Sequence, residues 1–574
     1  MSLTTALSSG IGALRVAQQG ISVTSRNISN AGTPSFVRGE VVLSSLPVTG
    51  GVQVLEVRRV ANDFLAAAAL TANADAAAAT ARGLVLDQAQ TAFGDPNEEL
   101  SLFGRIDSAF TALAQLQSDP SSSILRSAAV TAVDSAVAAI EGVSAELLAI
   151  RQSTDSQIDA TVGEINTLLE QIQFANREVV GSRANNTDPT PAENNRAALI
   201  DQLGQLVDIR VSEDPDSGVV TVRTEAGGFL VGFTRSQLTA GTAADGSAAI
   251  SLVSEDGQSI PFNPLLRSGE LAGLLEARNS DLPAFADGVA SLALTFVEAL
   301  NRETNLSTAV PAPQTLTGSV GGLVGAAPAG ITGALTLAVT SSFSEITASA
   351  SVDLTGLSLN DAILAINGAG VGVTAALNGA GQLTLSAPSG SGLVVGGAAA
   401  DAQGRSFSQA FGLNDFIGFT TDPAAAAASG APLGLAVRAD ILADPDRLPL
   451  ARPDLVVGAT LERGDGRGAQ GLANARNTEL PVAGTRLFAA ATNSVAEFST
   501  RLGAEVGRRS GAALAERDFA VALSSAADER RLGVEGVSLD EELVRLSQFQ
   551  ITFQSAARVV QAVDELFDVL INII

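Results

Sequence analysis

The stretch that decides the fold is the end of the chain, VSLDEELVRLSQFQITFQSAARVVQAVDELFDVLINII, residues 537–574. Ser538 stands three residues before Glu541, which is the spacing of a capping box and predicts that a helix begins here. Apolar residues then recur in steps of four and three, as in a helix that packs against another helix. The repeat comprises Leu539, Leu543, Leu546, Gln550, Phe553, Ala557, Val560, Asp564, Phe567, Ile571 and Ile574, and Phe549, Ala556, Val563, Leu566 and Leu570 widen it. A stripe this wide has to be covered by other helices.

The same repeat stands at the opposite end of the chain. It comprises Leu3, Leu7, Gly10, Leu14, Ala17, Ile21, Thr24 and Ile28. This helix should end near Asn30, because Gly32 favours a helix end and Thr33-Pro34 cannot continue one. We expect the two terminal helices to pair in one subdomain, with the rest of the chain inserted between them. Two alternatives stay open: the helices only cover each other, or they also present a second face to neighbouring copies.

Between the two ends, extended and helical patterns alternate. We expect strands at 36–43, 51–60, 209–211, 219–222 and 229–231. We expect a long helical region at 63–180, with breaks at 94–96 and 118–120. Further helices are expected at 195–206, 282–302 and 487–532. Residues 304–470 are rich in Gly, Ala, Thr and Pro with short alternating segments, which predicts an inserted β-rich outer domain. The predicted fold is α+β and multidomain: a terminal helical coiled-coil pair (1–40 with 535–574), a long helical rod-like domain with a β subdomain (41–303 with 471–534), and the insert.

The composition excludes several kinds of chemistry. The 574 residues include no Cys, His, Trp or Tyr, and all 34 basic residues are Arg. Thiolate nucleophiles, histidine relays and lysine Schiff bases are therefore excluded. The formal net charge of -27 argues against nucleic acid and anionic membrane as partners. We expect no enzyme, no cofactor and no metal site.

Short motifs that could suggest a site are better interpreted as turns. The glycine run 368–372 lacks the strand–loop–helix setting of a phosphate loop. The tripeptide Arg463-Gly464-Asp465 stands in a Gly-rich, charged run typical of a turn, and its functional meaning stays open. The acidic segments at 214–216 and 255–257 do not have the spacing of a calcium loop.

The chain start does not have the pattern of a secretory signal, so a secreted protein of this sequence would need another route out of the cell. Residues 1–19 carry no basic segment followed by an apolar run, so no cleaved signal peptide is expected. The longest uncharged stretch, between Glu303 and Glu345, contains Pro and many Gly, and it is interpreted as loops and strands rather than a membrane span.

Two segments at the chain ends resemble a known family. The segment NISNAGTPSFVR (27–38) has two Asn three residues apart, then Thr33, an aromatic residue and a basic residue. It resembles the N-terminal motif of the bacterial flagellar rod, hook and hook-associated proteins, although the family often has Gly-Tyr where this chain has Ser35-Phe36. The segment 537–572 is similar to the C-terminal helix of the same family. Finding both at opposite ends of one chain makes the resemblance specific.

The middle of the chain resembles one branch of that family. The passage from Asn194 to Val211 and the segment Gly269–Asn279 resemble the hook-associated member at the junction between hook and filament. Residues 359–367 followed by 383–385 are similar to small modules inserted in flagellins and filament-cap proteins. The resemblance covers about 1–300 and 470–574.

The resemblance implies a structural role in the extracellular flagellum: joining hook to filament and allowing filament assembly after export through the flagellar type III channel. The implied partners are further copies of the chain in an axial ring, the hook protein, the second hook–filament junction protein and a cytoplasmic export chaperone. Such terminal helices are expected to stay loose in the monomer and to order on assembly. The expected assembly interface comprises Leu3, Leu7, Leu14, Ile21, Asn27, Ile28, Asn30, Thr33, Pro34, Phe36, Leu539, Leu543, Leu546, Phe549, Phe553, Val560, Phe567 and Leu570.

Two other functions remain as alternatives. A hook or distal-rod protein shares the terminal motifs, but such proteins are expected to turn to β-domains soon after the first helix. A secreted acidic adhesin or surface-layer protein would fit the acidic composition and the Arg463-Gly464-Asp465 turn, but it has no reason to carry apolar repeats at both ends.

Overall fold

The structure is a computed structural model that describes residues 3–33, 35–46, 51–185, 187–342, 344–421 and 433–573. The chain divides into two compact units. Unit 1 comprises Met1–Val85, Ser153–Asn279 and Gly511–Ile574, and unit 2 comprises Leu86–Gln152 and Ser280–Ser510. Both chain ends therefore belong to unit 1. The three-domain boundaries expected from the sequence stay a prediction.

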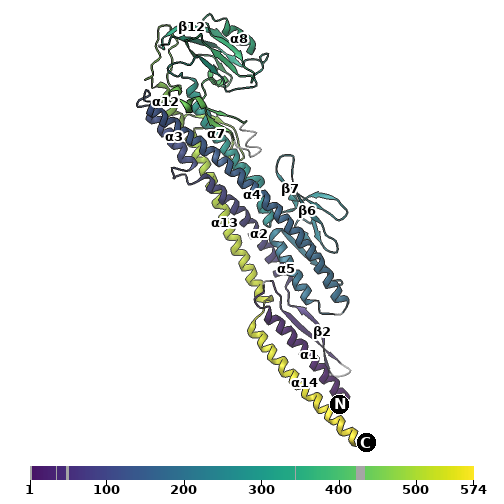
Figure 1. Cartoon of the computed structure of the whole chain (residues 1–574). Coiled ribbons are helices and arrows are strands. Elements are labelled where there is room, and N and C mark those ends of the chain that lie inside the picture. The colour runs from purple at the N-terminus through teal and green to yellow at the C-terminus, as the bar shows by residue number, and fades with distance from the viewer. Residues whose placement is uncertain are drawn as a thin grey trace. The chain divides into compact units, whose positions relative to one another are not determined.

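The chain ends of unit 1 form a helical pair. Helix α1 (Leu3–Ser29) packs along α14 (Leu539–Ile573) and against a hairpin of β1 (Gly39–Leu46) and β2 (Gly51–Arg59). Figure 1 shows α1 and α14 side by side, with the hairpin next to α1. The strands are antiparallel, with Gly39 opposite Arg59. The predicted terminal helical pair is confirmed.

Long helices follow with the predicted breaks. They are α2 (Asp63–Phe93), α3 (Leu102–Leu116), α4 (Ser123–Ala184), α5 (Thr190–Leu206) and α13 (Val495–Glu535). The first break contains Gly94 at φ +74°, a conformation that favours glycine. Helix α3 then begins at Ser101, whose Oγ accepts a hydrogen bond from the Gly104 N–H at 3.1 Å.

The predicted start of the last rod helix at Leu487 is wrong. Helix α13 begins at Val495, after strand β20 (Ala491–Asn493). Ser494 and Glu497 form a capping box there: the Glu497 N–H donates to Ser494 Oγ at 3.2 Å, and the Ser494 N–H donates to Glu497 Oε2 at 2.9 Å. The apolar residues before it belong to a short hairpin with β19 (Leu480–Val482).

Unit 1 also contains two small antiparallel sheets. The first comprises β3 (Ile209–Glu213), β4 (Val220–Thr224) and β5 (Phe229–Val231), close to prediction. The second comprises β6 (Gln237–Thr242), β7 (Ala248–Val253) and β8 (Ser259–Pro261). This sheet was not predicted from the sequence, because β6 and β8 are largely polar and exposed. The short helix α6 (Glu270–Glu276) and a π-helical turn (Ala277–Asp281) complete the segment.

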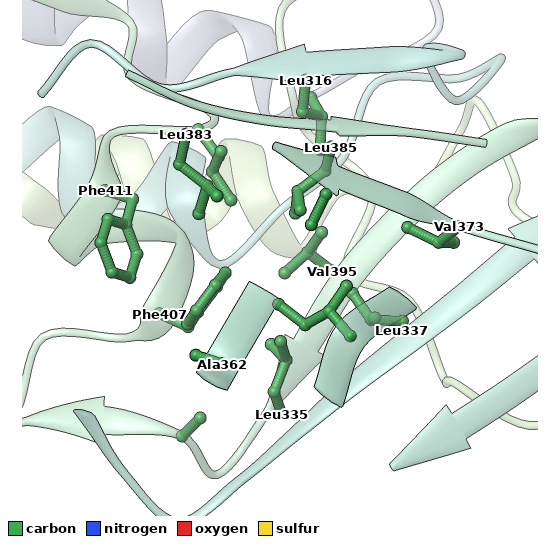
Figure 2. Packing of buried hydrophobic residues seen from close by; sticks show 14 of the residues in the cluster. Leu316, Leu335, Leu337, Ala362, Val373, Leu383, Leu385, Val395, Phe407 and Phe411 are labelled. Atoms are coloured by element: carbon green, nitrogen blue, oxygen red, sulfur yellow. The ribbon is translucent and has the colours of Figure 1, made fainter. Parts of the chain in front are cut away.

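Unit 2 is built around α7 (Leu282–Asn305) and the inserted module. The module has two three-stranded sheets: β12 (Ile346–Asp353), β11 (Ala334–Thr340) and β15 (Gly392–Gly397), and β13 (Thr374–Leu377), β14 (Leu383–Ser386) and β9 (Thr315–Thr317). Helix α8 (Leu359–Asn367) adds Ala362 and Ile366 to their shared core, and Figure 2 shows Leu335, Leu385 and Phe407 in this cluster. The α+β fold class is confirmed.

Short elements complete unit 2. They are β10 (Ile331–Thr332), β16 (Ala400–Asp401), α9 (Phe407–Phe411), β17 (Ile417–Phe419), β18 (Leu435–Val437), α11 (Ala439–Ala443) and α12 (Arg467–Asn474). The β-rich insert thus contains several short helices that its Gly- and Ala-rich sequence did not distinguish from turns.

Two helical stretches among the described residues, Asp63–Phe93 and Glu270–Asn305, are long and apolar enough by composition to cross a membrane. Core helices of proteins in water meet the same criterion, and 67% of the apolar window in the second stretch is buried inside the fold.

Candidate assembly site

The contact between α1 and α14 is asymmetric: one helix contributes large side chains and the other small ones. On α14 the large or apolar residues that are buried or half-buried recur in steps of three and four, and they include Leu546, Phe549, Phe553, Ala556, Val560, Val563 and Phe567. On α1 the buried residues include Gly10, Ala17, Gly20 and Thr24. A Cβ on Gly10 would lie 2.9 Å from Val560 Cγ2, so the α1 backbone comes close to the α14 side chains. The repeat predicted for α14 therefore faces the other terminal helix.

Gly20 is the closest point of this contact. A Cβ at this position would lie 2.5 Å from the Phe549 ring, which is shorter than any ordinary carbon contact. The Phe549 ring thus packs against the glycine backbone and fixes the register of the two helices.

We predict that Gly20→Ala destabilises the helical pair by about 1–3 kcal/mol, because the ring must move out of a packed contact. Unfolding of the terminal pair, followed by amide exchange of α1 and α14, measures this loss. Phe549→Leu in the same chain should restore much of it by removing the ring. A Gly20→Ala chain as stable as the natural one would contradict this packing.

Asn27 connects the N-terminal motif to the C-terminal helix. Its Nδ2 donates to the Gly39 carbonyl oxygen at 2.9 Å and to Glu542 Oε2 at 3.0 Å, and its Oδ1 accepts from the Gly39 N–H at 2.9 Å. Asn27 is 2% exposed and Glu542 is 1% exposed. One buried amide therefore holds the end of α1, the start of β1 and the first turn of α14 together.

A second buried group joins the end of α13 to the start of α2. Glu535 accepts from the Asn62 N–H at 2.7 Å and from Arg531 Nε at 2.8 Å. Arg531 also donates to both carboxylate oxygens of Asp201 on α5, at 3.0 and 3.1 Å. Burial raises the pKa of Asp201, and the charge of Arg531 opposes that shift. The carboxylates here are engaged in structural ion pairs.

The remaining motif residues surround a cavity of about 330 Å³. Asn30, Thr33 and Phe36 line it from the N-terminal motif, and Pro191 and Asn194 line it from α5. Around it, Arg26 pairs with Asp188 at 2.6 Å, and Asn194 Oδ1 accepts from Arg59 Nε at 2.7 Å. The motif thus ties α1 to α5 within unit 1.

A second apolar face of α14 is largely exposed in the described part of the chain. Four apolar residues recur on this face at intervals of seven or eight residues, which is two helical turns. They are Val544, Ile551, Val559 and Leu566. They are 58%, 62%, 45% and 53% exposed. Val544 and Ile551 each precede a half-buried residue, Leu546 and Phe553, by two positions, so they point away from α1. Val559 lies at the edge of this face, since its Cγ1 would be 3.6 Å from a Cβ on Gly10. We call these four residues the α14 flank.

The structure places the predicted interface residues in several environments. On α14, Phe549 and Val560 pack against Gly20 and Gly10 of α1. The half-buried residues are Leu546, Phe553 and Phe567 on α14, and Leu3, Leu7, Leu14, Ile21 and Ile28 on α1. Asn27 is buried, Asn30 and Phe36 are half-buried, and Thr33 is exposed. Leu539 and Leu543 are 50% and 54% exposed. Pro34 and the side chain of Leu570 lie outside the described residues.

Sequence analysis missed Glu542, Glu535 and Gly20. Acidic residues are common in the first turn of a helix, so the sequence does not distinguish Glu542 from Asp540 and Glu541, and only its burial does. Gly20 falls outside the predicted α1 repeat, and its neighbour in the fold is far away in the sequence.

The other motifs form turns. Arg463 pairs with Asp446 at 2.5 Å, and Asp465 pairs with Arg467 at 2.8 Å. Asp214 accepts from the Asp216 N–H at 3.1 Å. The glycine run 368–372 connects α8 to β13. The described part of the chain contains no group of three or more Asp or Glu arranged to hold a metal ion.

Two family models match the chain. The model described as the flagellar hook-associated protein FlgK helical domain matches residues 86–310. The model described as the C-terminal region of flagellar basal body rod FlgEFG proteins matches residues 531–573, which includes α14. The helical pair and these two matches make the chain similar to the flagellar axial proteins.

Within that class the chain is similar to flagellar hook-associated protein 1, as its middle segments predicted. It is 26% identical to that protein from Salmonella typhimurium over 307 residues (50% of this chain, 54% of the relative) and 25% identical to that from Escherichia coli over 314 residues (52% and 56%). The Bacillus subtilis protein is 23% identical over 249 residues (41% and 49%). The chain thus matches about half the length of these relatives.

Among solved structures, the chain is similar to the flagellar hook junction protein FlgK from Burkholderia pseudomallei. The TM-score is 0.48 and the sequence identity is 16%, over 82% of this chain and 100% of that chain.

Proposed function

We propose that this chain is a structural, non-enzymatic component of the bacterial flagellum that forms the junction between hook and filament. The observation that carries the proposal is the α1–α14 pair: it is held by the buried Asn27–Glu542 hydrogen bond and leaves the apolar α14 flank largely exposed. In water an apolar stripe of this length favours association with an equivalent surface. Copies of the chain arranged around an axis would provide that surface.

The proposed partners follow from this position. Copies of the chain would contact one another through the terminal pair, the hook protein would lie below and the second hook–filament junction protein above. A cytoplasmic chaperone would cover α14 before export through the flagellar type III channel. The α14 flank, together with the exposed Leu539 and Leu543 of the predicted set, would serve these contacts, whereas the predicted residues between α1 and α14 would hold the pair itself together.

Deleting this chain should give cells with bare hooks that release flagellin into the medium, because the filament has no base on which to grow. Electron microscopy of the cells and immunoblotting of the medium measure both effects, and the natural chain supplied in trans should reverse them. Normal filaments on the deletion strain would overturn the proposal. Cells without hooks would favour the alternative of a hook or distal-rod protein.

A further inference from the structure

The inserted module contains two Asn-Gly pairs in different environments. Asn367-Gly368 lies at the end of α8, and Asn378-Gly379 lies in the turn between β13 and β14. An Asn-Gly pair can lose ammonia spontaneously. The glycine nitrogen attacks the asparagine Cγ, the Cγ–Nδ2 bond breaks, and ammonia leaves. Water then opens the cyclic imide to an aspartyl or isoaspartyl residue.

The environment of Asn367 opposes this reaction. Its Oδ1 accepts from the Ala375 N–H at 2.6 Å, and its Nδ2 donates to the Ala375 carbonyl oxygen at 3.2 Å, so both ends of the side chain are held by β13. The Gly368 N–H donates to the Leu364 carbonyl oxygen at 2.9 Å. A nitrogen whose proton is engaged in a helical hydrogen bond is harder to deprotonate and is not free to attack.

The environment of Asn378 favours the reaction. Its Nδ2 donates to Gln382 Oε1 at 2.9 Å, so this side chain is also held at both ends. Its Oδ1 differs from that of Asn367 in accepting from two backbone N–H groups, those of Ala380 and Gln382, at 2.9 and 3.0 Å. These donors point at the oxygen that becomes negative when Cγ is attacked, as backbone donors do in an oxyanion hole. Asn378 and Gly379 are exposed, and within the described residues nothing accepts a hydrogen bond from the Gly379 N–H.

We infer that Asn378 is a site of spontaneous deamidation and that Asn367 is protected from it by the fold. The product carries a new negative charge at the tip of the β13–β14 hairpin. An aspartate there keeps both backbone N–H donors, now with a charged acceptor. An isoaspartate adds a methylene group to the backbone and disrupts the turn. This inference does not depend on the proposed role in the flagellum.

The test is incubation of the purified full-length chain at mildly alkaline pH, followed by digestion and tandem mass spectrometry that localises the replacement of amide by acid at each asparagine. We expect Asn378 to react at least about ten-fold faster than Asn367, which corresponds to about 1.4 kcal/mol in activation free energy. In urea the two sites should react at similar rates, because the pairs are then chemically equivalent.

Gly379→Ala is the matched variant. A Cβ at Gly379 meets nothing within 4 Å, so the fold is kept while the new side chain hinders the attack. The rate at Asn378 should fall to that of Asn367 or below, with an unchanged circular dichroism spectrum. Equal rates at the two asparagines in the folded chain, or an unchanged rate at Asn378 in this variant, would overturn the inference.

Discussion

Cells that carry Asn27→Asp are expected to assemble no filaments. The substitution keeps the size of the side chain but replaces the Nδ2 donor by an acceptor. That oxygen would then face the Gly39 carbonyl oxygen and the Glu542 carboxylate, both of which now accept from Nδ2. Glu542 keeps its ion pair with Arg545, at 3.3 Å, but loses the Asn27 donor and gains a like charge beside it. Breaking a buried charged contact costs about 3–5 kcal/mol, which is a large part of the stability of a typical domain. Amide exchange of α1 and α14 in the purified chain should rise strongly, while exchange in the inserted module stays unchanged.

Glu542→Gln is the matched partner for this experiment. Alone it keeps an acceptor for Asn27 Nδ2 and should cost only about 1 kcal/mol. Combined with Asn27→Asp it removes one of the two charges and offers a donor to the new carboxylate, so the double variant should be more stable than Asn27→Asp alone. The coupling free energy between the two substitutions measures the strength of the Asn27–Glu542 contact directly. Independent, additive effects, or normal filaments with Asn27→Asp, would mean that this hydrogen bond does not hold the terminal pair.

The sequence predicted the helices well because their signals are local. The breaks at Gly94 and at Ser118-Asp119-Pro120, and the end of α1 before Gly32, all lie where the structure has them. Each depends on a residue whose own backbone preference opposes a helix. The late start of α13 was missed because the apolar residues before Ser494 fit a helix and a short hairpin equally well.

The buried polar contacts of the candidate site could not be predicted in the same way. Asn27 and Glu542 are 515 residues apart in the chain, and an Asp-Glu-Glu segment at a helix start has an adequate local explanation. Likewise, the seven-residue repeat located a stripe on α14 but could not say which part of it the chain itself covers. That division depends on the register set by Gly20 and Phe549, which is a property of the folded pair.

Ile551→Glu should prevent assembly while leaving the monomer as stable as the natural chain. Ile551 is 62% exposed on the α14 flank, so a charge there disturbs no contact within the chain. Exposed substitutions of this kind change stability by about 0.5 kcal/mol or less. On assembly the same side chain would be buried against a neighbouring copy, where an isoleucine contributes about 1.5–3 kcal/mol and an unpaired carboxylate is strongly unfavourable. Thermal unfolding of the monomer and electron microscopy of filaments measure the two effects.

Two further substitutions separate the flank from the rest of α14. Gln554→Glu adds the same charge at an exposed, polar position outside the flank and should leave filaments intact. Leu546→Glu places the charge in the contact with α1, so it should stop assembly and also loosen both terminal helices in the monomer. The contrast between Ile551→Glu and Leu546→Glu is the decisive one, because only an interface with another molecule makes an exposed residue essential for assembly but dispensable for the monomer. Filaments of normal length with Ile551→Glu would show that the flank is a free surface and that the pair is complete in one chain.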